Sequence, residues 1–447
     1  MSIRLNSSKK SPRLVYIKTF GCQMNNYDSE IMAGVLTAHG HKMTDNPSEA
    51  DIILLNTCSI RDKAEQKVYS QVGRYRPYKD KNQNLIIGVG GCVGQLVGND
   101  ILKKAPLIDL VFGTSNIDKL PQFLDYINYS GERISRIDKA EEWTDKDIPI
   151  SRNTTKSGWV SIMRGCNNFC AYCVVPYARG RERSRAHQDI LKEIEELVRS
   201  GHSEVTLLGQ NVNSYGKGKE DEISFPQLLR LANQIEGIER IRFVTSHPKD
   251  FSPELVEAMK LEKICETIHL PLQSGSDHIL NRMNRGYTAT QYRSKVDMAR
   301  REIAGLTITT DIIVGFPGET EEDFAKTRDM VKEIGYDSMF LFKYSVRPGT
   351  AAADFDQQID EKTKQKRLEE ILNIQNQITL EKNRAYEGKV VEVMVEGPSQ
   401  DKKDIMIGKT RGNKVVLFPS ADGIREGDLI KIKIDKGRLY GLDGEVA

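Results

Sequence analysis

Short apolar runs rich in β-branched residues alternate with longer amphipathic stretches along most of the chain. From residue 13 the runs are RLVYIKTF, DIILLNTC, NLIIGVGGC and DLVFG, and each precedes a helical pattern such as YDSEIMAGVLTAHG or RDKAEQKVYSQVGRY. A buried strand followed by a crossover helix is the repeating unit of a parallel α/β sheet. Residues 12–130 therefore predict an α/β domain with an open parallel sheet.

A second alternating series begins at Trp159, after a polar and weakly periodic segment, residues 131–156, that we interpret as a linker. Amphipathic helices separate most of its strands. The candidate strands within residues 157–358 are 159–163, 204–209, 241–246, 267–272, 307–315 and 338–345. Six such repeats predict a partial (β/α)6 barrel of the TIM type, whose site would lie at the C-terminal ends of the strands.

The spacing of apolar residues changes in the last part of the chain. Residues 359–386 form a charged helical pattern that we interpret as a connector, and from Gly388 the apolar residues recur every second position. About five short strands separated by Gly, Pro, Asn and Asp within residues 387–447 predict a small antiparallel β-barrel, a shape often used on nucleic acids.

The composition is that of a soluble globular protein. Of 447 residues, 29% are charged and 38% belong to the hydrophobic class. No stretch reaches the roughly 18 consecutive apolar residues of a membrane helix, and the N-terminus lacks the apolar region of a secretory signal. We expect a cytoplasmic protein without a membrane span. The net charge of +2 leaves nucleic-acid binding open.

Seven cysteines are an odd count for a cytosolic chain, which favours metal binding or catalysis over disulfides. Cys166, Cys170 and Cys173 follow the first strand of the expected barrel with the spacing C-x3-C-x2-C. Three thiolates on a four-iron cluster leave one iron open to a small chelating molecule. The alternative is a zinc loop completed by a distant histidine. Cys265 lacks a partner in the sequence, and we assign it to the core.

A second set of cysteines, Cys22, Cys58 and Cys92, follows the first three strands in TFGC, LNTC and VGGC. Because the carboxyl ends of neighbouring parallel strands converge on one edge, these three could meet in space. The alternative is that they are small buried apolar residues.

The three-cysteine spacing resembles the signature of the radical S-adenosylmethionine enzymes, in which the open iron holds that cofactor. Tyr172 matches the aromatic position of the signature and would lie near the adenine. Motifs along nearly the whole chain resemble those of the methylthiotransferases, most closely the branch that acts on isopentenyladenosine in tRNA. These motifs are GCQMNNYDSE, NTCSIRDKAEQK, GGCVGQ, RGCNNFCAYCVVPYARGRERSR, LLGQNVNSYG, SHPKDF, HLPLQSGS, DIIVGFPGET and RPGTAA.

This resemblance implies two [4Fe–4S] clusters, one on each set of three cysteines, and a C-terminal RNA-binding TRAM module. The implied reaction inserts a methylthio group at C2 of an adenine beside the anticodon, with one S-adenosylmethionine as radical source and a second as methyl donor. A side-chain base does not remove the hydrogen at C2, so a cofactor-derived radical is required. The implied partners are the tRNA anticodon stem-loop, a reductant such as flavodoxin or ferredoxin, and a donor of sulfur or iron–sulfur clusters. We expect a monomer.

The ends of the barrel strands should supply the cofactor contacts. The expected contacts are Gln210, Asn211, Ser246, His247, Gln273, Ser274 and Asp311. Asp311 lies within an otherwise apolar strand, where an unpaired carboxylate would be costly, so it should point into the barrel toward a partner. His247 could instead be an ordinary packed histidine.

The substrate contacts are predicted from charge and position. Alternating arginines beside the cysteine loop are suited to a phosphate backbone, although a charge run is also typical of a solvated face. These arginines are Arg164, Arg179, Arg181, Arg183 and Arg185. Arg347 could bind phosphate or cap the barrel. Gln23, Asn25 and Asn56 are candidates for lining a chamber at the second cysteine set.

Rival functions remain at this stage. Two related branches act on threonylcarbamoyladenosine in tRNA and on an aspartate of a ribosomal protein, and the cysteines do not discriminate among them. A different class would be a non-catalytic iron–sulfur or zinc protein that binds RNA.

Overall fold

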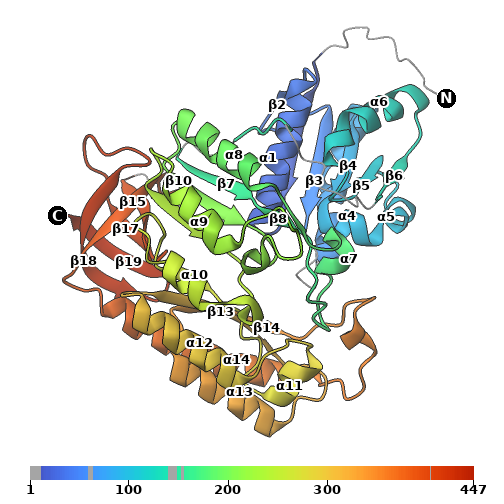
Figure 1. Cartoon of the computed structure of the whole chain (residues 1–447). Coiled ribbons are helices and arrows are strands. Elements are labelled where there is room, and N and C mark those ends of the chain that lie inside the picture. The colour runs from blue at the N-terminus through green and yellow to red at the C-terminus, as the bar shows by residue number, and fades with distance from the viewer. Residues whose placement is uncertain (1–11, 59–63, 139–147, 153–155, 403) are drawn as a thin grey trace. The chain divides into compact units, whose positions relative to one another are not determined.

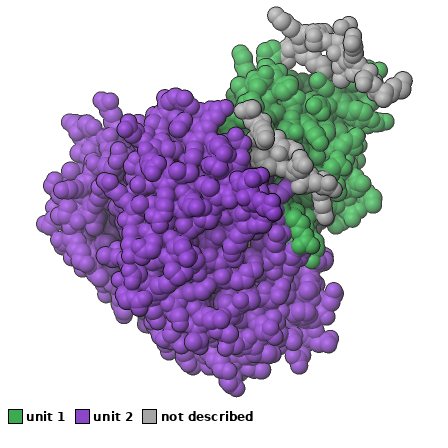
Figure 2. All heavy atoms as spheres, in the orientation of Figure 1, with its two compact units in different colours: residues 1–153, 174–181 green, residues 154–173, 182–447 purple. Residues whose placement is uncertain are grey.

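A computed structural model describes residues 12–58, 64–138, 148–152, 156–402 and 404–447, and Figure 1 labels its elements. Parts of the expected helix at 61–75 and of the expected linker at 131–156 lie outside these residues. The chain divides into two compact units, residues 1–153 with 174–181 and residues 154–173 with 182–447, coloured in Figure 2. No helix among the described residues is long and apolar enough to cross a membrane.

The first unit is built on a six-stranded sheet in the order β2-β1-β3-β4-β5-β6, in which all neighbours are parallel. Its strands are β1 Leu14–Thr19, β2 Lys42–Met43, β3 Ile52–Thr57, β4 Ile86–Gly90, β5 Leu110–Phe112 and β6 Ile134–Arg136. Its helices are α1 Gln23–Ala38, α2 Ala64–Arg74, α3 Arg76–Lys81, α4 Gly91–Val97, α5 Asn99–Lys104, η1 Ile117–Lys119, α6 Leu120–Ser130 and α7 Val175–Arg179. The expected open parallel sheet is confirmed, and the central strand β3 is buried along its whole length.

The segment interpreted as a linker contributes a strand to this sheet. β6 pairs in parallel with β5 through Ile134, Ser135 and Arg136. Only Ile134 of the three is buried. A three-residue edge strand has too few apolar positions to produce a periodic signal, which is why the sequence pattern did not predict it.

The second unit contains the six expected barrel strands, in two parallel sheets of three with the orders β7-β10-β11 and β12-β13-β14. A parallel bridge between Ile241 and Ile264 connects the two halves. The strands are β7 Ser157–Ser161, β10 Glu204–Leu208, β11 Arg240–Phe243, β12 Thr267–His269, β13 Thr307–Val314 and β14 Ser338–Lys343. The helices are α8 His187–Arg199, η2 Val212–Ser214, α9 Phe225–Asn233, η3 Pro248–Asp250, α10 Pro253–Ala258, α11 Asp277–Arg282, α12 Ala289–Glu302, α13 Glu321–Ile334, η4 Ala351–Asp354 and α14 Glu361–Arg384.

The two faces of these strands differ in chemistry. Val205 and Leu207 of β10, with Ile308 and Ile312 of β13, belong to one apolar core shared with the surrounding helices. Because side chains alternate along a strand, the residues between them point to the inner face of the partial barrel. That face carries polar residues, among them Asp311.

The C-terminal strands form a closed barrel in the order β15-β16-β17-β19-β18. They are β15 Val390–Pro398, β16 Ile405–Thr410, β17 Val415–Pro419, β18 Leu429–Arg438 and β19 Gly441–Val446. All pairs are antiparallel as expected, except that β17 and β19 run parallel. That parallel pair closes the barrel, because β19 follows β18 in a hairpin and then meets β17 at its other edge.

This small barrel rests on the N-terminal ends of the larger barrel's strands. Arg242 of β11 donates to the carbonyls of Thr410 and Arg411 at 2.9 and 2.8 Å, and Arg240 donates to that of Lys409 at 2.8 Å. Thr307 at the start of β13 donates to the carbonyl of Gly412 at 2.8 Å. The opposite strand ends, where the site is expected, therefore remain clear of it.

Candidate functional site

The loop that carries Cys166, Cys170 and Cys173 follows β7 at the C-terminal end of the barrel strands. Two short antiparallel strands, β8 Met163–Arg164 and β9 Arg183–Ser184, pair at its base. Gly165 takes the left-handed φ of 77°, and its N–H donates to Oε1 of Gln210 at 2.5 Å. Gln210, expected to bind cofactor, thus fixes the start of the cysteine loop.

Donor groups surround the thiols of this loop. Nδ2 of Asn168 lies 3.5 Å from the sulfur of Cys166. Nη1 of Arg285 lies 3.3 Å from both the sulfur of Cys170 and the hydroxyl of Tyr172. Burial raises the pKa of Cys166 and of Tyr172. A guanidinium beside thiols in a buried setting suits a group that carries negative charge when bound.

Arg285 is itself held firmly. It is 4% exposed, and its other nitrogens donate to the carbonyl of Pro271 at 2.9 Å and to the hydroxyl of Tyr287 at 3.0 Å. The sequence analysis missed this residue, because a lone arginine after a helix carries no local signal and only the fold brings it to Cys170.

The strand ends above the barrel carry buried polar atoms that lack a hydrogen-bond partner within the described part of the chain. They are Oδ1 of Asn211, both amide atoms of Asn213, Oγ of Ser246, Nε2 of His247 and Oε1 of Gln273. All five residues are at most 7% exposed. Buried polar groups are normally hydrogen-bonded, so this cluster fits a polar small molecule such as S-adenosylmethionine. Asn213 was not predicted from the sequence.

His247 is neutral in this environment. Burial, followed by the charges of Arg285, Lys249 and Lys295, lowers its pKa to about 2. Its Nδ1 accepts from the N–H of Lys249 at 3.2 Å, so the neutral ring carries its proton on Nε2. The unpaired Nε2 is therefore a donor.

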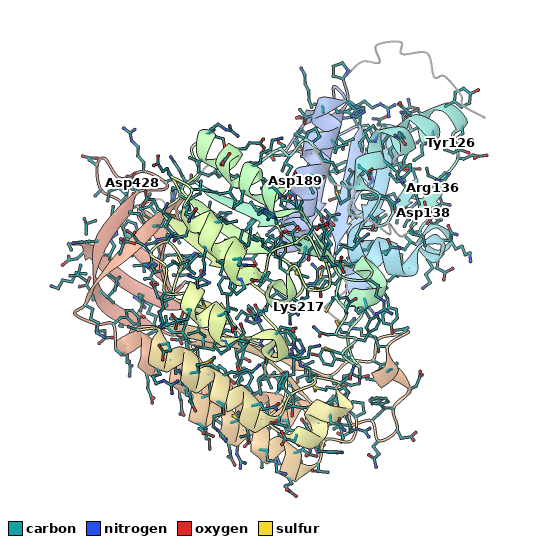
Figure 3. The ribbon with its side chains drawn as sticks, in the orientation of Figure 1. Tyr126, Arg136, Asp138, Asp189, Lys217 and Asp428 are labelled. Atoms are coloured by element: carbon teal, nitrogen blue, oxygen red, sulfur yellow. The ribbon has the colours of Figure 1, made fainter. Side chains whose placement is uncertain are left out.

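Neighbouring polar groups brace this region. Asp250 accepts from Nδ2 of Asn211 at 2.7 Å and pairs at 2.5 Å with Lys217, which is labelled in Figure 3. The Asn211 amide is thereby oriented so that its oxygen stays unpaired.

Besides Gln210, two of the expected cofactor residues have other partners. The hydroxyl of Ser274 lies 3.2 Å from that of Thr327 and accepts from the N–H of Ser276, so it orders a loop. Asp311 points to the inner face of the barrel as expected, and its Oδ1 lies 3.3 Å from Nε2 of His269.

The second cysteine set lies at the sheet edge of the first unit. Cys22 is the N-cap of α1, and Cys92 lies in the first turn of α4. A Cβ added to Gly21 would lie 2.5 Å from Cβ of Cys58, and one added to Gly91 would lie 2.4 Å from the carbonyl oxygen of Thr57. Only glycine allows the cysteine-bearing turns to approach this closely.

Arg179 of α7 lies at these cysteines. It pairs with Asp28 at 2.7 Å, and the two side chains are 4% and 0% exposed. Although burial works against it, the charges of Asp28, Cys92 and Cys22 raise the pKa of Arg179. Hydrogen bonding from Cys58 outweighs burial and, with the charge of Arg179, lowers the pKa of Cys22 to about 6.

The sequence predicted Arg179 as a phosphate contact, whereas in the structure it has the buried carboxylate of Asp28 as its partner. Arg185 also has a carboxylate partner, Glu193 of α8, so neither is a free cation. Arg181 is exposed, Arg183 and Arg347 are half-buried, and Arg164 is buried. Spacing in sequence did not predict these outcomes, because the arginines lie on separate short elements, among them β8, α7 and β9, rather than on one periodic face.

Two of the three residues expected to line the second site bridge its turns. Nδ2 of Asn25 donates to Oδ1 of Asn56 at 3.2 Å, and Nδ2 of Asn56 donates to the carbonyl of Asn25 at 2.7 Å. Both are fully buried, whereas Gln23 is exposed.

Among the described residues, no three Cys, His, Asp or Glu side chains already stand in a metal-binding arrangement. The donors nevertheless fit iron–sulfur clusters in kind and number, because each set offers three soft thiols beside a buried arginine.

Three family models match the chain. Residues 14–113 match the uncharacterized protein family UPF0004, residues 160–331 the radical SAM superfamily and residues 384–447 the TRAM domain. A solved structure, the radical S-adenosylmethionine methyltransferase TsrM from Kitasatospora setae, has the same fold over 76% of this chain and 75% of that one, with a TM-score of 0.58 and 14% identity. The chain is thus a radical S-adenosylmethionine protein with a TRAM domain.

Curated relatives cover its whole length. A tRNA-2-methylthio-N(6)-dimethylallyladenosine synthase of Clostridium perfringens is 47% identical over 449 residues, 100% of both chains. Another of Clostridium botulinum is 48% identical over 436 residues, 96% of this chain and 95% of the relative. The chain belongs to this family of radical S-adenosylmethionine methylthiotransferases.

Proposed function

We propose that this chain inserts a methylthio group at C2 of N6-isopentenyladenosine beside the anticodon of tRNA. The full-length match to synthases named for this product carries the proposal. The buried polar atoms at the barrel strand ends that have no hydrogen-bond partner among the described residues support it. In this proposal residues 12–130 with the strand β6 (Ile134–Arg136), residues 157–358 and residues 387–447 are the three working domains, and residues 359–386 connect the last two.

The radical chemistry would take place at the barrel. Cys166, Cys170 and Cys173 would hold a [4Fe–4S] cluster, with Arg285 donating toward Cys170. When bound, this cluster and S-adenosylmethionine supply a 5′-deoxyadenosyl radical. Asn211, Asn213, Ser246, His247 and Gln273 would bind the polar groups of the cofactor. Since His247 is neutral, its ring would add no positive charge to repel the cationic sulfonium. Its Nε2 would donate a hydrogen bond to the cofactor.

The sulfur to be inserted would be held at the second cysteine set. Cys22, Cys58 and Cys92 would hold a second [4Fe–4S] cluster, and Arg179 would balance the negative charge of its thiolates. The helix N-termini at Cys22 and Cys92 would also favour thiolates. Gly21 and Gly91 would let the turns close around the cluster.

The partner would be the tRNA anticodon stem-loop, with the TRAM barrel as an RNA-binding module. A reductant such as flavodoxin or ferredoxin would supply electrons, and a sulfur or iron–sulfur donor would restore the second cluster. We propose that the chain works as a monomer.

The test is an anaerobic assay of reconstituted full-length chain with S-adenosylmethionine, dithionite and an anticodon stem-loop that contains N6-isopentenyladenosine. Mass spectrometry of the digested nucleosides should detect the 2-methylthio product. A matched stem-loop with threonylcarbamoyladenosine should yield none. Product from that RNA instead, or cleavage of S-adenosylmethionine with no methylthiolated RNA, would overturn the substrate assignment, and no cleavage at all would overturn the radical mechanism.

A further inference from the structure

The inner face of the β12–β13–β14 sheet carries an aromatic ring beside a polar pair. In the register of these strands His269 faces Thr309, and Asp311 faces Phe340. Figure 1 shows β13 and β14 running side by side. The side chains of His269, Asp311 and Phe340 lie next to one another on three neighbouring strands, and we call this set the inner-face row.

The polar pair is oriented by a third residue. Nδ1 of His269 lies 2.9 Å from the hydroxyl of Thr309, and its Nε2 lies 3.3 Å from Oδ1 of Asp311. This arrangement fixes the carboxylate in one orientation. Oδ2 of Asp311 makes no hydrogen bond within the described residues, and 26% of the side chain remains accessible. An acceptor-only oxygen is thus presented to the inner face.

Phe340 supplies an open aromatic surface next to this acceptor. It is 59% exposed, whereas its neighbours Met339 and Leu341 pack against the apolar core on the other face. Its ring lies 6.0 Å from that of His269, with an interplanar angle of 69°. Edge contact with His269 steadies the ring and leaves a face available for stacking.

We propose that the inner-face row recognises the substrate base, an N6-alkylated adenine, with Phe340 stacking on the purine and Asp311 accepting its remaining N6–H. This inference rests on the proposed function and specifies the substrate contacts within it. An alkyl group on N6 leaves one N–H, which matches a single free carboxylate oxygen. A base taken out of its stack is commonly held by an aromatic side chain and by hydrogen bonds to its edge. His269 and Thr309 are positioning residues that act through Asp311.

The proposal changes the role expected for Asp311 from cofactor binding to substrate binding. It also predicts discrimination by the RNA. An adenine with two substituents on N6 has no N–H to donate, and would leave the carboxylate oxygen without its partner.

The experiment measures equilibrium binding of full-length chain to two stem-loop RNAs that differ only at the target base, one with N6-isopentenyladenosine and one with N6,N6-dialkyladenosine. Phe340→Ala should weaken binding of the first RNA by about 5- to 150-fold, the range that loss of one base–aromatic stack produces. Phe340→Tyr retains the ring and should bind like the wild type. The exposed position of Phe340 makes both substitutions tolerable to the fold.

Asp311 is tested by a cycle of two proteins and two RNAs. The wild type should prefer the RNA with an N6–H by about 10- to 150-fold, and Asp311→Ala should remove that preference. Equal binding of the RNAs by the wild type, or a preference that survives Asp311→Ala, would overturn the proposal. Asp311→Ala that keeps the preference but loses S-adenosylmethionine binding would return Asp311 to the cofactor. Wild-type chain that yields no methylthio product would instead overturn the proposed function.

Discussion

Cys22 shows how the fold changes the chemistry of a single thiol. Hydrogen bonding from Cys58 and the charge of Arg179 lower its pKa to about 6, although burial opposes them. The pKa of Cys92 shifts in the opposite direction, because burial raises it. Two cysteines of one set therefore differ in acidity before any cluster binds.

This difference predicts selective alkylation in the metal-free chain. Since the thiolate is the nucleophile, iodoacetamide should modify Cys22 faster than Cys92, with the Cys22 rate rising through about pH 6. Cys58→Ala should move that rise to higher pH. Peptide mapping by mass spectrometry measures both sites in one sample, so Cys92 is the internal control. Equal rates at the two cysteines near pH 7 would contradict the account.

His247 predicts a loss of stability in acid. Its pKa is about 2 in the folded chain and about 6.5 when unfolded, so the unfolded state binds the proton more strongly as the pH falls below about 6.5. Between pH 7 and pH 5 this residue should remove about 2 kcal/mol of unfolding free energy.

Denaturant unfolding at these two pH values tests the effect. Between pH 7 and pH 5 the unfolding free energy of the wild type should fall by about 2 kcal/mol more than that of His247→Gln. His39→Gln, at an exposed histidine, is the matched control and should behave as the wild type. An identical pH dependence in wild type and His247→Gln would contradict a buried neutral imidazole.

At the scale of elements, the joint between the TRAM barrel and the larger barrel is built from buried charge. Nε of Arg242 lies 2.8 Å from Oε2 of Glu204, and the two side chains are 7% and 8% exposed. The same guanidinium satisfies two carbonyls of the β16–β17 turn. Removing it would break this buried ion pair and take a donor from each of the two carbonyls.

Arg242→Ala should therefore destabilise the chain by about 3–5 kcal/mol, the usual cost of breaking a buried pair. Arg301→Ala is the control, because Arg301 pairs with Glu302 on the exposed surface of α12 and should cost at most about 1 kcal/mol. Unfolding in denaturant compares the two variants. Similar losses from both would mean that the joint contributes little to stability.

The elements were predictable where an apolar period was long enough. All six strands of the larger barrel and the switch to period two near Gly388 follow from alternation of apolar residues. The edge strand β6 and the parallel β17–β19 pairing did not follow, because three residues show no period and pairing partners depend on closure of the barrel.

At the scale of the whole molecule, the sequence predicted which residue types meet, but not which polar groups they satisfy. The sequence predicted the first cysteine set from its spacing and the second from its position after strands, and their role as cluster ligands stays a prediction. Arg179 was predicted as a phosphate contact but pairs with Asp28, and Arg285 was not predicted at all, since a charged side chain takes the partner that the tertiary fold provides. Their common position beside cysteines became visible only in the structure.

That common position suggests one design used twice, with three thiols and one buried arginine in each unit. If each set holds its own cluster, the two should be lost independently. A shared site, or a single cluster, would not allow independent loss.

The most direct measurement is therefore the iron and sulfide content of anaerobically reconstituted chain. Wild type should contain about eight irons and eight sulfides. The triple alanine variant of Cys22, Cys58 and Cys92 should contain about four of each, and so should that of Cys166, Cys170 and Cys173. An N-terminal variant that retains the wild-type content would contradict the account, because those three cysteines would then hold no cluster and could not supply the inserted sulfur.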